Sequence, residues 1–162
     1  MYKKILVPLD GSALAERAIW HAEEIARGSD AEIVLLQAVY VPMPVVPESA
    51  LLTERKFLDK VTMEAAGYLE RVAAELRASG RKVRTVIDER PPTDAIVHVS
   101  EQEQADLIVM STHGRSGLSR LVMGSIAESV LRATHRTIVF VKPERPAVTA
   151  RHQKENRIAG SE

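Results

Sequence analysis

The chain has 162 residues, 45% of them hydrophobic and 27% charged, which is typical of one globular domain with its own core. The 22 basic and 22 acidic residues cancel, so the chain lacks the basic excess of a nonspecific nucleic-acid binder. Aromatic residues, at 4%, are too few for a base-stacking platform, and the lack of cysteine excludes disulfides, thiolate metal sites and a cysteine nucleophile. No apolar run approaches the ~20 residues that cross a bilayer. We therefore expect a cytoplasmic protein with neither nucleic acid nor membrane as a partner.

Five short runs rich in apolar and β-branched residues predict strands. They cover residues 4–9, 32–39, 82–87, 106–110 and 137–141. Four of these runs are almost continuously apolar, as in strands that are covered on both faces. The run at 82–87 alternates polar and apolar residues, which indicates a half-covered strand.

The stretches between these runs carry apolar residues at three- and four-residue spacing, which predicts helices. They cover residues 13–28, 50–79, 94–103 and 125–134. Strands that alternate with helices in this way predict an α/β fold with a mostly parallel sheet. Two segments lie outside the alternation: the proline-rich residues 40–49 predict a loop, and residues 143–162 predict a disordered tail.

The segment that follows the fourth predicted strand contains Gly114 and Gly117, which lack a Cβ and allow a ligand to approach the backbone closely. Arg115 and Arg120 could add positive charge beside them. The sequence contains neither G-x-x-x-x-G-K-[ST] nor G-x-G-x-x-G, which excludes the standard P-loop and dinucleotide fingerprints.

The last predicted helix is expected to begin at Gly124 and Ser125, because Ser125 and Glu128 match the capping-box pattern S-x-x-E. Amides without helical partners meet the positive end of the helix dipole at such a start, which favours a bound phosphate. Two interpretations stay open from the residue types alone: an anion site, or an ordinary junction between a strand and a helix.

Asp10 follows the first predicted strand, at the sheet edge where ligands bind in open α/β folds. Its carboxylate could hold a ribose hydroxyl or a metal ion. Alternatively, Asp10 or Ser12 caps the first helix. Asp10 has no evident partner for acid–base chemistry and Ser125 has no adjacent base, so we expect no catalytic residue.

Together these segments resemble a universal stress protein of the nucleotide-binding kind. The resemblance covers about residues 2–142, and it is carried by residues 3–12, 105–110, 112–120, 124–128 and 137–141. The ATP pattern of the family is G-x2-G-x9-G-[ST]. Its last three positions are Gly114, Gly124 and Ser125 in this chain.

The resemblance implies a single domain over residues 1–142 with the adenine nucleotide alpha hydrolase-like fold. That fold is an open five-stranded parallel sheet of order 3-2-1-4-5 with helices on both faces. The resemblance also implies a homodimer through the strand Thr137–Val141, because family members cover this edge with a second copy.

The resemblance further implies ATP, with Mg or Mn, as the ligand. Asp10 would bind the ribose or the metal-bridged phosphates, and Ala38 would meet the adenine with its backbone. The full set of implied binding residues is Pro8, Asp10, Ala38, Met110, Ser111, Gly114, Arg115, Gly117, Gly124, Ser125 and Ile126. Among these, Asp10 alone is the implied metal contact, through the metal that accompanies ATP.

The chain departs from the family at two positions. Ser111 stands at the first glycine of the pattern, near the ribose, where its side chain could crowd the sugar or hydrogen-bond to it. Arg90 precedes two prolines where the family often has Gly-x-Pro, and it could obstruct the pocket mouth or attract phosphate.

The resemblance implies a cytoplasmic regulatory or stress-response module that binds ATP, hydrolyses it slowly at most, and shows a nucleotide-dependent surface to a protein partner. The alternative is a nucleotide-free dimeric interaction protein that has lost ATP affinity through Ser111 and Arg90. The residues do not separate ATP from AMP or cyclic AMP, since all three share adenine and ribose.

Overall fold

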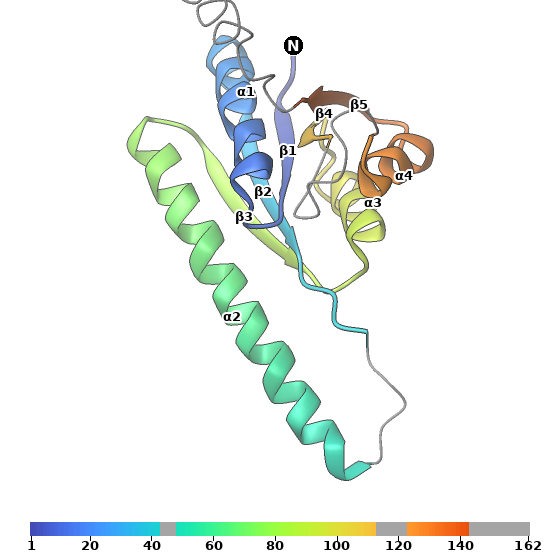
Figure 1. Ribbon diagram of the computed structural model, residues 1–162. Helices are drawn as coiled ribbons and strands as arrows, with labels where there is room; N and C mark the ends of the chain where they lie inside the picture. Colours follow the sequence, from blue (N-terminus) through green and yellow to red (C-terminus); the bar gives the residue numbers. More distant parts are fainter. Residues whose placement is uncertain (43–47, 113–122, 143–162) are drawn as a thin grey trace, which may run out of the picture.

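The computed structural model of the chain describes residues 1–42, 48–112 and 123–142, and strands and helices alternate along them (Figure 1). The elements are β1 (Lys4–Leu9), α1 (Ala13–Ser29), β2 (Glu32–Ala38), α2 (Glu48–Ala78), β3 (Val83–Asp88), α3 (Pro92–Gln102), β4 (Leu107–Ser111), α4 (Ser125–Ala133) and β5 (Thr137–Val141). The predicted tail, residues 143–162, lies outside the described part, so it stays a prediction together with the domain boundary at residue 142. Within the described part, no helix is both long and apolar enough to span a bilayer.

The sheet has the order β3-β2-β1-β4-β5, and every neighbouring pair of strands is parallel. This confirms the predicted fold class and strand order. The bounds predicted for the first and last strands are confirmed at both ends, and the third and fourth strands lie one residue further along the chain.

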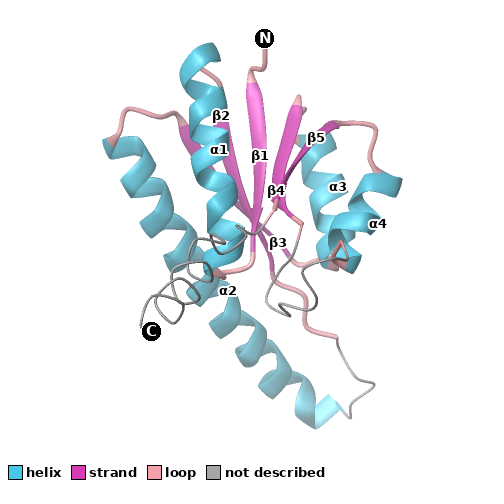
Figure 2. Cartoon of the chain, turned by 45° about the horizontal axis from the view of Figure 1, so that its top comes forward, coloured by secondary structure: helices cyan, strands magenta, loops and turns pink. Residues whose placement is uncertain are grey.

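Two apolar cores lie on opposite faces of the sheet, because side chains alternate between the faces along each strand. Ile5 and Val7 of β1 pack on the same side as α1 and α2. Leu6 of β1 and Val34 of β2 pack on the side of α3 and α4. Figure 2 shows the two pairs of helices on either side of the strands, which confirms helices on both faces.

Charged side chains link the amino-terminal ends of the strands. The Lys4 Nζ lies 3.5 Å from a carboxylate oxygen of Glu32 and 3.2 Å from one of Glu103. Arg84 pairs with the same two carboxylates. This edge of the sheet is therefore joined by ion pairs, while the carboxyl-terminal ends of the strands border the cavity described below.

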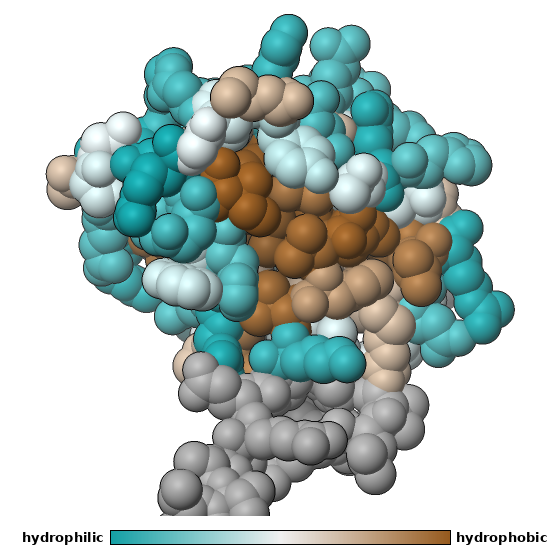
Figure 3. All heavy atoms as spheres, turned by 90° about the horizontal axis from the view of Figure 1, so that it is seen from above, coloured by the Kyte–Doolittle hydropathy of each residue, from teal (hydrophilic) through white to brown (hydrophobic). Residues whose placement is uncertain are grey.

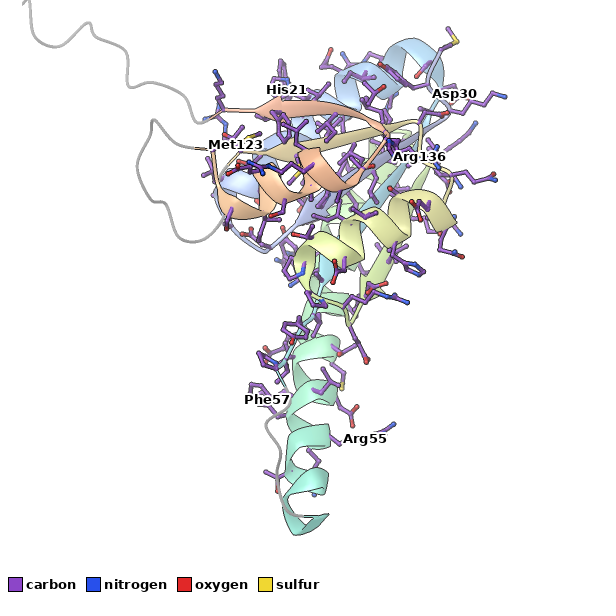
Figure 4. The ribbon with its side chains drawn as sticks, turned by 90° about the vertical axis from the view of Figure 1, so that its right-hand side faces the viewer. His21, Asp30, Arg55, Phe57, Met123 and Arg136 are labelled. Carbon is purple, nitrogen blue, oxygen red and sulfur yellow. The ribbon has the colours of Figure 1, made fainter. Side chains whose placement is uncertain are left out.

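α2 has 31 residues, which corresponds to about 46 Å of helix. Its second half packs on the sheet through buried residues such as Leu69 and Leu76. Its first half extends away from the sheet, where Arg55 and Phe57 lie (Figures 1 and 4). The helix begins at Glu48, so the predicted loop over residues 40–49 is wrong at its last two residues, and residues 43–47 lie outside the described part.

Candidate functional site

A cavity of about 500 Å³ lies at the carboxyl-terminal edge of the sheet, and we call it the sheet-edge cavity. The ends of β1, β2 and β4 border it, together with the start of α4. This is the edge at which ligands bind in open parallel sheets. The strand order that places β1 beside both β2 and β4 therefore also brings these chain segments to one site.

Eight of the predicted binding residues line this cavity. They are Pro8, Asp10, Ala38, Met110, Ser111, Gly124, Ser125 and Ile126. The other three, Gly114, Arg115 and Gly117, lie outside the described residues. The structure thus gathers predicted residues from four separate elements or their ends, and their role in binding stays a prediction.

Asp10 fixes the turn between β1 and α1. Its Oδ1 accepts hydrogen bonds from the Ser12 backbone N–H at 2.9 Å and from the Ser12 hydroxyl at 2.6 Å. Gly11 has a φ of 79°, in the left-handed region that glycine adopts most easily. The Ser12 Oγ accepts from the Ala15 N–H at 3.1 Å, so the structure bears out Ser12, not Asp10, as the cap of α1. Asp10 positions the cap and also lines the cavity.

α4 begins without a side-chain cap. The expected start at Gly124 and Ser125 is confirmed, but the capping box is wrong, because Gly124 is the N-cap and Ser125 is already the first helical residue. Glu128, the other half of the expected box, pairs with Arg132 one turn later at 2.5 Å. The first turn of α4 therefore faces the cavity with the positive end of its dipole, and no side chain of the described residues caps it, which favours an anion there.

A backbone hydrogen bond joins the end of β4 to the start of α4. The Gly124 N–H donates to the Thr112 carbonyl at 2.8 Å, and the Thr112 N–H donates to the Val141 carbonyl of β5 at 3.0 Å. These bonds hold Gly124 beside the end of β4. The two ends of the glycine-containing segment are therefore fixed at the cavity.

The two departures from the family have different places in the structure. Ser111 is buried at the end of β4 and lines the cavity, where its hydroxyl adds a polar group. Arg90 is not among the described residues that line the cavity. Its Nη1 lies 2.6 Å from Asp88 Oδ2, and its N–H donates to Asp88 Oδ1 at 2.9 Å. Arg90 therefore forms an ion pair in the turn after β3, and its effect on nucleotide binding stays a prediction.

Several further lining residues were not predicted from the sequence. Among them, Tyr40, Val61, Pro92 and Ile96 supply apolar surface, and Gln37 contributes an amide. Tyr40 and Pro92 follow the ends of β2 and β3, so the rule that ligands bind at this edge could have suggested them. Val61 and Ile96 come from helices, and their sequence pattern indicates only apolar helix faces.

Among the described lining residues, Asp10 supplies the one carboxylate. In the part of the chain that the structure covers, no group of three or more metal-ligating side chains comes together. Mg²⁺ usually takes one or two carboxylates together with substrate phosphates, so a lone carboxylate beside an anion site fits a metal that arrives with phosphates. Such a metal would neutralise phosphate charge, and Asp10 would hold it.

The comparisons with known proteins agree with this architecture. The model of the universal stress protein family matches residues 1–142. Universal stress protein MJ0531 of Methanocaldococcus jannaschii is 36% identical over 146 residues, covering 88% of this chain and 83% of that protein. The solved structure of protein MJ0577 of the same organism is 31% identical, with a TM-score of 0.76, and covers 90% of this chain and 99% of that chain.

A universal stress protein solved in complex with cyclic AMP has the same fold, with a TM-score of 0.62 and 22% identity over 88% of this chain and 99% of that chain. The family match spans every described element, and the MJ0531 relative is similar over most of both chains. The chain therefore belongs to the universal stress protein family.

Proposed function

We propose that the chain binds an adenine nucleotide, ATP with Mg²⁺ or Mn²⁺, in the sheet-edge cavity. The observation that carries this proposal is the meeting, in one cavity, of the Asp10 carboxylate, the Ser111 hydroxyl and the α4 start that lacks a side-chain cap. The volume of about 500 Å³ is in the range of about 300–1,000 Å³ that is usual for small-molecule sites.

The cavity lining offers apolar groups for a base and polar groups for a ribose and phosphates. Apolar lining residues such as Val61 and Ile96 would contact the base, and the backbone of Ala38 would offer it hydrogen-bonding groups. Asp10 and Ser111 would meet the ribose, and the first turn of α4 would meet the phosphates. The cyclic AMP complex of a protein with the same fold supports an adenine nucleotide as the ligand class.

In our proposal, the nucleotide regulates a stress response in the cytoplasm. The segment between Thr112 and Gly124 would contact the phosphates, so nucleotide occupancy would change the surface that the chain offers to a protein partner. The fixed ends of this segment support the idea, because both ends lie at the cavity wall. We expect hydrolysis to be slow at most.

We also propose a homodimer through β5. This strand is at the edge of the sheet, beside β4, and its central residues Ile138, Val139 and Phe140 are only partly buried. Figure 3 views the side of the molecule on which β5 lies in Figure 1 and shows apolar side chains in a band between hydrophilic margins. An exposed apolar edge strand tends to pair with another strand, and an antiparallel contact with a second copy would cover it.

The nucleotide proposal is tested by thermal unfolding of the full chain, stripped of bound nucleotide, with and without millimolar Mg-ATP. A ligand at 100 times its Kd stabilises the folded state by about 2.7 kcal/mol. At about 2–4 °C per kcal/mol for a chain of this size, we expect the midpoint to rise by several degrees.

Gly124→Val should abolish this rise, because its side chain would stand at the cavity-facing start of α4. Ala133→Val, at the exposed far end of the same helix, is the matched control and should keep the rise. No rise with ATP, ADP, AMP or cyclic AMP would overturn the proposal and favour the nucleotide-free dimer. Light scattering that gives one subunit mass at micromolar concentration would overturn the dimer.

A further inference from the structure

The chain's single tryptophan, Trp20, lies in a second hollow that shares no lining residue with the sheet-edge cavity. This hollow has a volume of about 350 Å³ and runs between α1 and α2, and we call it the α1–α2 groove. Trp20 is 61% exposed in it. An indole this exposed on a folded domain stands out, because tryptophan is usually well buried and is enriched at binding interfaces.

Hydrogen bonds link α1 to α2 at one end of the groove and to the residue after α2 at the other. The Tyr68 hydroxyl of α2 donates to the Glu16 carboxylate of α1 at 2.9 Å. At the other end, just after α2 ends at Ala78, the Ser79 hydroxyl donates to the Glu23 carboxylate of α1 at 2.9 Å. α1 and α2 run parallel between these two hydrogen bonds. Trp20 lies on α1 between Glu16 and Glu23. The groove is therefore already formed without a partner.

The lining of the groove combines apolar surface with negative charge. Ile19, Trp20, Val72 and Leu76 supply the apolar part, and Glu16, Glu23 and Glu75 supply three carboxylates. Among the described lining residues there is no lysine or arginine. The hydroxyl donors on Glu16 and Glu23 are neutral, so these two bonds leave the negative charges in place.

Two arginines of α2 contact partners that do not line the groove. The Arg71 guanidinium lies 5.5 Å from the centre of the Tyr68 ring, and Arg77 pairs with Glu70. Burial raises the pKa of Tyr68, and the hydrogen bond to Glu16 and the Glu16 charge raise it further. The lining itself therefore supplies the negative charge of the groove, through its three carboxylates.

We propose that the α1–α2 groove binds an arginine or lysine side chain that a segment of a partner protein presents. A cation placed over an indole face is attracted by the ring, and its aliphatic stem gains apolar contact with groups such as Ile19 and Val72. The carboxylates of Glu23 and Glu75 complement its charge. This site is separate from the nucleotide cavity and does not depend on the proposed function.

Because Trp20 is the only tryptophan, its fluorescence reports on this groove directly. We would titrate the full chain with an acetylated tetra-arginine amide and follow the tryptophan emission. The matched probe is the tetra-citrulline peptide, which has nearly the same shape without charge. We expect a saturable change with tetra-arginine that weakens as salt is added, and little change with tetra-citrulline.

Glu75→Gln removes one charge and keeps the size of the side chain, and we expect it to weaken tetra-arginine binding about two- to fivefold. Glu101→Gln is the matched control, since Glu101 is exposed on α3 at the opposite face of the sheet and the change in net charge is the same. Equal responses to the two peptides, or equal affinities in the two variants, would overturn the proposal.

Quenching of the free chain tests whether the groove is open for a partner. Relative to their quenching of free N-acetyltryptophanamide, caesium should quench Trp20 more effectively than iodide because of the carboxylates, and the emission should not depend on protein concentration. Shielding of Trp20 from both ions would mean that another part of the chain fills the groove. Emission that changes with protein concentration would mean that a second copy fills it. Either result would overturn the assignment to a partner protein.

Discussion

α1 and α4 both begin at the sheet-edge cavity, but side chains of the described residues complete the start of only one of them. At α1, the Ser12 hydroxyl accepts from the Ala15 N–H, and Asp10 holds Ser12 in place. At α4, the N-cap is Gly124, which has no side chain that could accept a hydrogen bond. Among the described residues, a side chain caps the start of α1, whereas no side chain caps the start of α4.

This difference separates stability from ligand binding. Capping groups satisfy the first amides of a helix and stabilise the fold, and a bound anion does the same when it is present. We therefore expect changes at the start of α1 to lower the free energy of unfolding whether or not ligand is present. Changes at the start of α4 should act mainly on the stabilisation that nucleotide adds.

Asp10→Ala should have the largest effect on the free protein, because it removes the acceptor of two hydrogen bonds to Ser12. Hydrogen bonds to charged groups contribute about 1.5–3 kcal/mol, so we expect a loss of about 2 kcal/mol, or roughly 4–8 °C in the unfolding midpoint. The variant should also lose the rise with Mg-ATP. Thermal unfolding with and without Mg-ATP measures both effects.

Asp10→Asn is the matched variant, since its amide oxygen can still accept from Ser12 while the charge is gone. It should keep most of the stability and lose most of the Mg-ATP effect. If Asp10→Asn and Asp10→Ala were equally unstable, the turn would depend on the charge of Asp10. The effect of this residue on stability could then not be separated from its effect on nucleotide binding.

Ser12→Ala should lower the free energy of unfolding by about 1 kcal/mol, the usual loss for an N-cap serine, or about 2–4 °C. The Mg-ATP rise should survive, because Ser12 is absent from the described lining of the cavity. Thermal unfolding of the free and nucleotide-saturated variant checks this. Loss of the rise alone, with stability unchanged, would show that α1 also contributes its start to the ligand.

The strands and the start of α4 show what can be predicted from the sequence. Four almost continuous apolar runs and one alternating run, at 82–87, located all five strands, because the burial of strand faces leaves these two patterns in the sequence. The start of α4 was predicted correctly, but the pattern Ser125–Glu128 suggested a capping box that does not form. A pattern of residue types cannot show which residue is the N-cap, since a shift of one position moves serine from the N-cap into the helix.

The sequence predicted lining residues that lie at the ends of strands, but not those that come from α2 and α3. Residues at the ends of β1, β2 and β4 line the cavity as expected, because parallel strands end at one edge. Val61 reaches the cavity only because α2 continues past the sheet, and nothing local in the sequence specifies that. Arg90 turns to Asp88 because the two residues are neighbours in one tight turn.

Tyr68→Phe tests whether the start of α1 is also held from outside the cavity, through Glu16. The variant loses one part-buried hydrogen bond to a carboxylate, whereas Asp10→Ala loses two, so we expect a loss of about 1 kcal/mol at neutral pH. Chemical denaturation of both proteins measures the difference, and an unchanged midpoint would show that the packing of α1 on α2 suffices without this bond.

The same pair predicts a pH dependence. Burial, together with the hydrogen bond and charge of Glu16, raises the pKa of Tyr68 above its ordinary value of 10.0. The folded state therefore favours the protonated phenol, and this contribution is complete below pH 10.0 and is lost as the pH rises toward the raised pKa. The wild type should lose stability above pH 10.0 more steeply than Tyr68→Phe. Parallel slopes would contradict this account.

Gly124→Ser should have the smallest effect on the free protein and gives the sharpest test of the comparison, because it supplies α4 with the cap that α1 already has. Serine exceeds glycine as an N-cap by only a few tenths of a kcal/mol, so the unfolding midpoint should rise by about 1 °C or less. The new hydroxyl would accept from the same amides that the phosphates are proposed to use, and the rise with Mg-ATP should shrink. Calorimetric titration with Mg-ATP should show weaker binding than in wild type, whereas Ala133→Ser at the other end of α4 should bind normally. Unchanged affinity in Gly124→Ser would place the phosphates away from the α4 start, and the missing cap would then have no functional meaning.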